Sequence, residues 1–229
     1  WKRFLDAYDR KNSIRTEGDS KAVLEAGDGD WSFPAPMVKR GDRWVFDTDA
    51  GREEVLNRRV GRNELDTVQT LLAIVDAQRE YAVSDADGNG LRDYAARFAS
   101  TPGHKDGLYW EVPAGSTDEA SPFGPFLAEK AAYFSDREAG DPFMGYYYRI
   151  VTRQGENAPG GRYDYVINGN MIAGFAMVAW PADYANSGVM TFIVNQNGKV
   201  YQKDLGEKTE VGAAAIQDYD PDSSWAEAG

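Results

Sequence analysis

The sequence predicts an α+β protein, in which one long helix packs on an antiparallel β-meander and a small β-rich lobe precedes them. Two observations lead to this fold class. Apolar β-type runs between residues 161 and 206 are joined at Asn168-Gly169 and Asn197-Gly198, and Asn-Gly fits the two positive-φ positions of a type I′ hairpin turn. From residue 49 to residue 82, apolar residues instead recur at the helical period of 3.6.

Residues 1–47 are predicted to form the small lobe, as the remainder of a larger N-terminal domain. Four apolar residues at its start have helical spacing: Trp1, Phe4, Leu5 and Tyr8. Three strands are expected after this helix, at 21–26, 31–39 and 42–47. Pro34 and Pro36 fall within the middle strand, which indicates an edge or a bulge there.

Residues 48–229 are predicted to form the main domain, which begins with a helix from about 49 to 82 that is bent or broken near Gly61. The stripe expected to pack on the sheet consists of Leu65, Val68, Leu72 and Val75, and it is widened by Leu71, Ile74 and Tyr81. The first half of this helix is strongly charged. Such a pattern is typical of a helix face exposed to solvent or of a helix that holds the preceding β-ribbon through charged contacts.

The rest of the main domain is expected to be mostly strand. Two short helices are predicted first, at 92–99 and 124–134. Strands are then expected at 146–153, 162–167, 170–180, 188–196 and 199–204. The segment 170–180 is apolar on both faces, which predicts a central strand that is covered on both sides. The tail 205–229 is expected to be irregular and anchored by Trp225.

Composition excludes several kinds of chemistry. The net charge of −12 argues against binding to nucleic acid and to anionic membranes, and no apolar run approaches the ~20 residues of a transmembrane helix. The chain has no cysteine, so it lacks thiol nucleophiles, disulfides and thiolate metal sites. Its single histidine, His104, rules out a metal site built from several histidines.

The segment from residue 85 to residue 93 matches the first part of a calcium-binding loop. Asp85, Asp87 and Asn89 stand at positions 1, 3 and 5 of the pattern, a glycine stands at position 6, and Asp93 stands at position 9. Such alternating oxygen ligands predict a bound calcium ion. Position 12 is Ala96 rather than a carboxylate, so a turn whose Asp side chains accept hydrogen bonds from its own amides is the alternative.

Other candidate sites are less specific. His104 lies in a loop and needs a nucleophile and an acid brought to it by the fold before it can act as a base. The Gly-rich segment 155–161 precedes no helix and lacks the Gly-Lys-Ser/Thr sequence of a phosphate loop. Paired carboxylates of the glycosidase type are compatible with the many acidic residues. Four aromatic residues are candidates for stacking on sugars or for ordinary packing: Tyr109, Trp110, Tyr147 and Trp180.

Several long segments resemble a bacterial exported family known as domain of unknown function 2950. They include Gly51-Arg-Glu-Glu-Val-Leu-Asn-Arg-Arg-Val-Gly-Arg-Asn-Glu-Leu, Gly107-Leu-Tyr-Trp, Asn157-Ala-Pro-Gly-Gly and Gly174-Phe-Ala-Met-Val-Ala-Trp-Pro-Ala. The resemblance runs over nearly the whole chain and implies a mature, trimmed protein of the periplasm or cell envelope. It implies no activity, because the family has none assigned.

A looser resemblance covers residues 63–204. A long helix that ends in Ala-Gln-x-x-Tyr, followed by an Asp/Gly loop and a β-meander, is similar to the soluble part of type IV pilin-like and pseudopilin-like proteins. The resemblance implies a single helix laid across an antiparallel sheet. The chain differs from pilins because it lacks their apolar assembly helix and has an N-terminal ribbon instead.

Three functions remain open from the sequence. The first is a non-enzymatic envelope interaction or assembly module, with other envelope proteins as partners and calcium as a structural ion. The second is a module that binds cell-wall glycans or a small ligand, which predicts a groove lined by Tyr or Trp. The third is a hydrolase that uses carboxylates, with or without His104, which predicts two acids or an acid and the histidine in one cleft.

Overall fold

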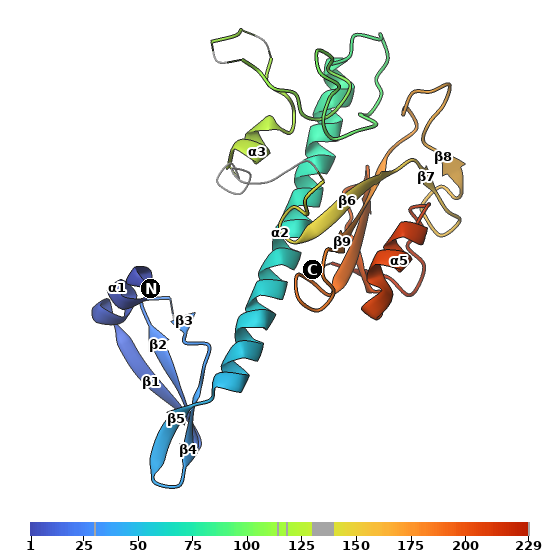
Figure 1. The fold of residues 1–229 in the computed structure, drawn as a ribbon. Coiled ribbons are helices and arrows are strands. Elements are labelled where there is room, and N and C mark those ends of the chain that lie inside the picture. The colour runs from blue at the N-terminus through green and yellow to red at the C-terminus, as the bar shows by residue number, and fades with distance from the viewer. Residues whose placement is uncertain (30, 114, 118, 130–139, 229) are drawn as a thin grey trace. The chain divides into compact units, whose positions relative to one another are not determined.

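The computed structural model describes residues 1–229 apart from 30, 114, 118, 130–139 and 229 (Figure 1). The chain divides into two compact units, Trp1–Gly61 and Arg62–Gly229, here called the N-terminal and C-terminal units. Antiparallel sheets and a long helix confirm the α+β class. Twelve of the 25 Lys/Arg and 12 of the 37 Asp/Glu lie in residues 1–61, so the net charge of −12 belongs entirely to the C-terminal unit.

The N-terminal unit contains one short helix, an antiparallel sheet with the strand order β1-β2-β4-β5, in which β3 pairs with β2, and the first part of a long helix that begins at Thr48. Its elements are α1 (Lys2–Arg10), β1 (Asn12–Glu17), β2 (Lys21–Ala26), β3 (Trp31–Ser32), β4 (Met37–Arg40) and β5 (Arg43–Phe46). The predicted strand 31–39 is broken between Ser32 and Met37, where Pro34 and Pro36 lack the N–H that a sheet requires. The first strand was not predicted, because all of its residues are exposed and only one of them is a large apolar residue.

Aromatic rings hold the N-terminal unit together. Its described residues include only three buried apolar side chains, those of Ala22, Val23 and Ala26. The ring centroid of Phe4 lies 5.7 Å from that of Trp31 and 5.6 Å from that of Phe33, and the ring centroid of Phe33 lies 5.6 Å from that of Phe46. These rings remain partly exposed, so the unit presents much aromatic surface to solvent.

Helix α2 (Thr48–Ser84) is longer than predicted and continues without a break through Gly61. The face that it buries is rotated from the predicted stripe. Leu65 and Leu72 are 62% and 40% exposed, so their predicted packing on the sheet is wrong. The buried side chains of the helix are those of Thr67, Thr70, Leu71, Ile74, Val75, Ala77, Gln78 and Tyr81.

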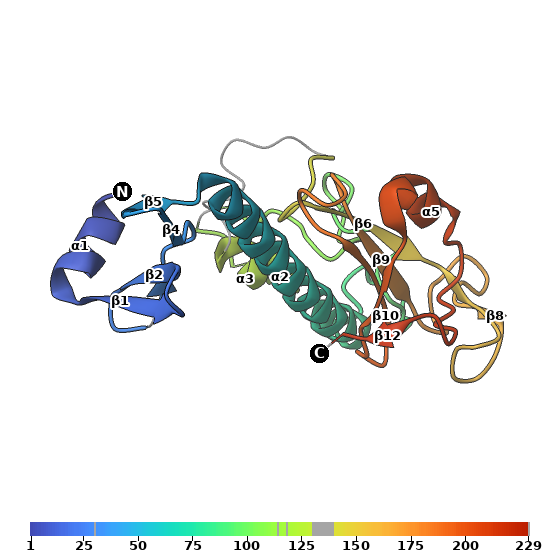
Figure 2. The ribbon, with the colours of Figure 1, turned by 90° about the horizontal axis from the view of Figure 1, so that it is seen from below.

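The C-terminal unit is built on a five-stranded antiparallel sheet with the order β12-β11-β10-β9-β6. Its strands are β6 (Tyr146–Val151), β9 (Ala176–Pro181), β10 (Met190–Asn195), β11 (Tyr201–Asp204) and β12 (Ala226–Glu227), while β7 (Arg153–Gln154) and β8 (Tyr163–Asp164) form a separate pair. Strand β9 is almost entirely buried, because α2 lies on one side of the sheet and α5 (Thr209–Ala215) on the other (Figure 2). The predicted central strand is therefore found, although it begins at Ala176 rather than at 170.

The turns explain where the strands begin. At Asn168-Gly169 both residues have positive φ, as a type I′ turn requires, and Ile167 pairs with Asn170 across it. Gly174, with a φ of 148°, then bends the chain before β9 starts. At Asn197-Gly198 only the glycine has positive φ, and its N–H donates to the carbonyl of Asn195, so this pair does not form a type I′ turn.

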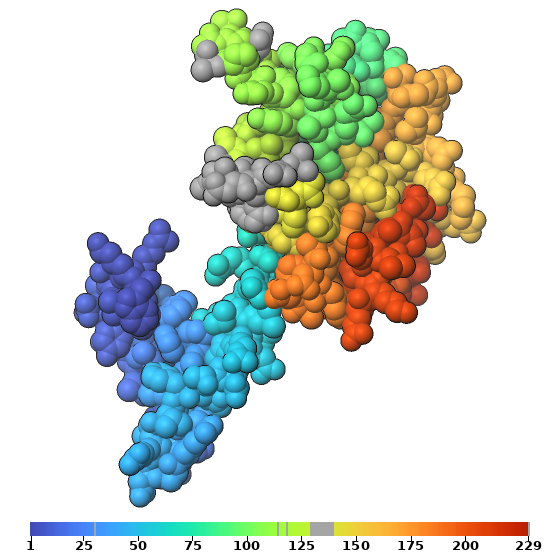
Figure 3. Space-filling view, viewed as in Figure 1, coloured from blue at the N-terminus to red at the C-terminus, as the bar shows by residue number. Residues whose placement is uncertain are grey.

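The C-terminal tail is not irregular as predicted. It contains a 3₁₀ turn (Gly206–Lys208), α5 and β12, and the space-filling view shows it in red against the orange strands (Figure 3). Arg149 Nη2 donates to the carbonyls of Ala213 and Ile216, at 3.0 and 2.6 Å. A guanidinium at the carboxyl end of a helix satisfies its free carbonyls and complements its dipole. Trp225 packs against the core, as expected.

Candidate functional site

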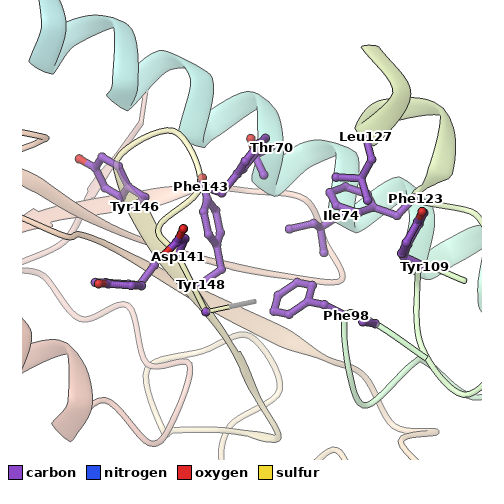
Figure 4. Close-up of a pocket in the computed structure, with 13 residues that line it drawn as sticks. Thr70, Ile74, Phe98, Tyr109, Phe123, Leu127, Asp141, Phe143, Tyr146 and Tyr148 are labelled. Carbon is purple, nitrogen blue, oxygen red and sulfur yellow. The ribbon is translucent and has the colours of Figure 1, made fainter. Parts of the chain in front are cut away.

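An apolar cavity of about 280 Å³ lies between α2, α3 (Gly124–Glu129) and β6 in the C-terminal unit (Figure 4). We call it the aromatic pocket. Its aromatic lining consists of Phe98, Tyr109, Phe123, Phe143, Tyr146, Tyr147 and Tyr148. Thr70 and Ile74 of α2 and Leu127 of α3 complete much of the wall, so the described surface is mostly carbon.

Hydrogen bonds fix the walls of the aromatic pocket. Phe143 and Tyr146 exchange backbone hydrogen bonds of 2.8 and 2.9 Å around a tight turn, in which Met144 and Gly145 both have positive φ. The hydroxyl of Tyr146 donates to the carbonyl of Met190 at 3.0 Å, and the hydroxyl of Tyr148 lies 3.3 Å from Thr67 Oγ1. These contacts tie the start of β6 to α2 and to β10.

The electrostatics of the aromatic pocket favour an apolar or aromatic group. Among the described residues that line it, Asp141 is the only carboxylate, and none is Lys, Arg or His. Burial raises the pKa of Tyr146, with a further contribution from Glu64, so this phenol stays protonated at neutral pH. The lining therefore provides ring faces, aliphatic surface and a few hydroxyls.

A second hollow, of about 510 Å³, is formed by the loop from Ala99 to Val112. It brings His104 and Glu111 to one cavity, as the hydrolase hypothesis requires. Among the described residues no hydrogen bond joins these two side chains, and the hydrolase hypothesis stays a prediction. Lys105 Nζ lies 5.2 Å from the centre of the Trp110 ring in the same hollow. His104 is absent from the described lining of the aromatic pocket.

The predicted calcium loop folds as turns directly after α2, with the N–H of Gly88 donating to the carbonyl of Asp85 at 3.0 Å, but the described residues that follow it do not form the expected second helix. The helix predicted at 92–99 is wrong, because Gln78 of α2 binds both backbone groups of Ala95 at 2.8 Å, and Tyr94 and Ala99 form isolated β-bridges. Both carboxylate oxygens of Asp85 accept from the N–H of Gly90.

The remaining three candidate ligands are close together. Asn89 Nδ2 donates to Asp87 at 2.8 Å and to Asp93 at 3.1 Å. Burial raises the pKa of Asp93; the hydrogen bond from Asn89 opposes this shift, while the charges of Asp87 and Asp85 add to it. No group of three or more His or acidic side chains in the described part of the chain is arranged to hold a metal ion. The calcium site of Asp85, Asp87, Asn89 and Asp93 stays a prediction.

A calcium titration tests this prediction. Calcium at about 100 times its Kd is expected to raise the free energy of unfolding by about 2.7 kcal/mol, measured by denaturant titration with and without a chelator. Asp87→Asn should abolish the increase, whereas Asp19→Asn, in an exposed turn, should retain it. An equal response of wild type and Asp87→Asn would contradict calcium binding at this loop.

The Gly-rich segment 155–161 is held in place by hydrogen bonds to Asp220 and to Gln154. Asp220 accepts from the backbone N–H and from the side-chain amide of Asn157, at 2.7 and 3.0 Å. The buried Gln154 donates to the carbonyls of Pro159 and Gly161 and accepts from the hydroxyl of Tyr165. These bonds indicate a structural role for the segment, and no residue of 155–161 is among the described lining of the aromatic pocket.

Two of the four aromatic candidates, Tyr109 and Tyr147, do line the aromatic pocket. Trp180 instead packs on Tyr147 with ring centroids 5.8 Å apart, and Trp110 lines the second hollow. The sequence reasoning missed Phe98, which falls in the helix predicted at 92–99, and Phe123 and Phe143, which fall in no predicted element. Their only signal was the high density of Phe and Tyr between residues 94 and 148.

The fold and the site define a class: an α+β protein with an aromatic pocket between a long helix and an antiparallel sheet. Over residues 1–228 the chain matches the family described as protein of unknown function (DUF2950), and it belongs to that family. No curated protein and no solved structure matches it. In the described part of the chain, no helix is both long and apolar enough to cross a bilayer.

Proposed function

We propose that this protein is an exported binding module of the cell envelope, which takes an apolar or aromatic group of its ligand into the aromatic pocket. The observation that carries the proposal is the lining, in which seven aromatic side chains surround a cavity of about 280 Å³. A cavity of this size accommodates one ring or a short aliphatic chain. Burying such a group is favoured by about 25 cal/mol per Å² of apolar surface removed from water.

The expected ligands are components of the envelope. The pocket suits the apolar side chain of a partner protein or the acyl part of an amphiphile, and its rings also suit the apolar face of a sugar. Export and an envelope location are part of the proposal and rest on the resemblance to an exported family. The pilin-like character of the main domain stays a prediction, and filament assembly is not part of the proposal.

A fluorescent probe tests the pocket directly. The uncharged fluorophore 1-N-phenylnaphthylamine is expected to bind the purified chain saturably at one site, because one of its two aromatic groups can enter a pocket lined by aromatic rings. Ala99→Phe should weaken this binding by at least about tenfold, or 1.4 kcal/mol, since residue 99 lines the pocket and the new ring occupies it.

Ala96→Phe is the matched control, because residue 96 is exposed on the same segment and does not line the pocket. It should leave the affinity unchanged. Adding chitin oligomers or muropeptides as competitors then separates glycans from apolar ligands. Unsaturable binding, or equal affinity of Ala99→Phe and wild type, would show that the pocket is not a binding site.

A further inference from the structure

The strand β5 at one edge of the N-terminal sheet is exposed and unprotected. It ends the strand order β1-β2-β4-β5, and Trp44, Val45 and Phe46 are 44%, 36% and 49% exposed. The opposite edge, β1, is polar, and its Arg15 forms ion pairs with Glu17 and Glu25. Soluble proteins usually place charges, prolines or bulges on an edge strand to prevent pairing. The apolar centre of β5 has none of these, which marks it as a pairing surface.

The backbone groups that face the open side belong to Trp44 and Phe46. The N–H of Asp47 donates to the carbonyl of Pro36 at 2.8 Å, on the side of β4. Because backbone groups alternate along a strand, Val45 and Arg43 also face β4, as their pairing with Val38 and Arg40 requires. The N–H and C=O groups of residues 44 and 46 therefore point away from the sheet.

We propose that two copies of the chain associate through β5, paired antiparallel about a two-fold axis at Val45. In this register Trp44 lies opposite the partner's Phe46, Val45 opposite the partner's Val45, and Arg43 opposite the partner's Asp47. Trp44 and Phe46 are at hydrogen-bonding positions of such a pair. The backbone N–H and C=O groups of both residues therefore form hydrogen bonds with those of the partner strand. The interface is isologous, and every residue meets a chemically suitable partner.

Side-chain chemistry supports a second copy as the occupant. Phe46 already packs on Phe33, so the opposed Trp44 and Phe46 extend this aromatic cluster across the axis. In the described structure Arg43 forms no ion pair. The carboxylate of Asp47 accepts one hydrogen bond, from the backbone N–H of Ala50 at 3.2 Å, which caps α2. The N-terminal unit has no net charge, so two such units do not repel each other.

Molar mass in solution tests the proposal. At about 100 µM, sedimentation equilibrium of the chain is expected to give twice the monomer mass of 25.3 kDa. Val45→Lys should give the monomer mass, because two ammonium groups then face each other at the axis. Val45→Glu should also be monomeric, whereas an equal mixture of the two variants should recover the dimer mass.

Ile14→Lys on the polar edge strand is the matched control and should remain dimeric. Circular dichroism of each variant should match wild type, because residues 14 and 45 are both exposed. A wild-type chain with the monomer mass would overturn the proposal. This includes a monomer that binds phosphatidylcholine vesicles through its exposed aromatic rings. A dimer that Val45→Lys leaves intact would also overturn it. The result is independent of the aromatic pocket, which lies in the other unit.

Discussion

Replacing Gln78 with leucine is expected to lower the free energy of unfolding by about 2 to 5 kcal/mol. Gln78 is fully buried, and its side chain donates to the carbonyl and accepts from the N–H of Ala95, both at 2.8 Å. Leucine fills a similar volume but leaves both backbone groups of the buried Ala95 without a partner. Each buried polar group left unsatisfied costs about 1–3 kcal/mol. Urea denaturation monitored by circular dichroism measures the change.

The same substitution should also weaken ligand binding, because Phe98 of the aromatic pocket lies three residues beyond Ala95. Gln69→Leu is the control, since residue 69 is exposed on the same helix, and its stability should remain within about 0.5 kcal/mol of wild type. A Gln78→Leu variant as stable as Gln69→Leu would mean that the segment after α2 does not depend on this pair of hydrogen bonds.

Local chemistry made much of the fold predictable. The positive φ of Asn168 and Gly169, the start of α3 at Gly124-Pro125 and the long helix each follow from short-range rules that hold whatever surrounds them. The end of α3 predicted at 130–134 lies outside the described residues. Strands with alternating or continuous apolar runs were found for the same reason, whereas the polar edge strand β1 had no such signal.

The prediction for α2 was confirmed for Leu71, Ile74, Val75 and Tyr81, which are buried, and wrong for Leu65 and Leu72, for a physical reason. A prediction based on apolar residues leaves out Thr67, Thr70 and Gln78. All three are nevertheless buried, because their polar side-chain atoms have hydrogen-bond partners. The two threonine hydroxyls donate to the carbonyls of Asn63 and Asp66 one turn earlier, at 2.7 Å, and Gln78 binds Ala95. Polar groups with a partner can enter a core, and the partner is known only from the structure.

The aromatic pocket was beyond sequence reasoning because its walls come from segments far apart along the chain. Ile74, Phe98, Leu127 and Tyr148 lie on a helix, a loop, a second helix and a strand. No spacing rule relates these positions. Tyr109 and Tyr147 were named as candidates by residue type, whereas Phe98, Phe123 and Phe143 were assigned to no site.

Replacing Gly188 with alanine is expected to destabilise the protein by about 3 to 5 kcal/mol, well above the usual effect of a point substitution. An alanine Cβ at this position would lie 2.0 Å from the hydroxyl oxygen of Tyr146 and 2.5 Å from the ring carbon that bears it. Tyr146 is fully buried, so its ring has no free space to move into.

The strain would spread because residues next to Gly188 anchor the sheet to α2. Glu64 accepts from the N–H groups of Val189 and Met190 at 2.9 and 3.0 Å, and Asn63 donates to the carbonyl of Ser187 at 2.8 Å. Displacing this segment weakens those hydrogen bonds together with the one from Tyr146 to Met190. Thermal unfolding should therefore show a large fall in Tm.

Gly61→Ala provides a control with the opposite sign. Apart from its own helix backbone and chain neighbours, no atom of the described residues lies within 4 Å of the position that its Cβ would occupy. Residue 61 is inside a helix, where alanine is favoured over glycine by about 1 kcal/mol. The Gly61 variant should thus be more stable than wild type, and the Gly188 variant much less stable. Equal stabilities for the two variants would show that Gly188 does not pack against Tyr146 in solution. A fall for both would point instead to a helix that needs flexibility at residue 61.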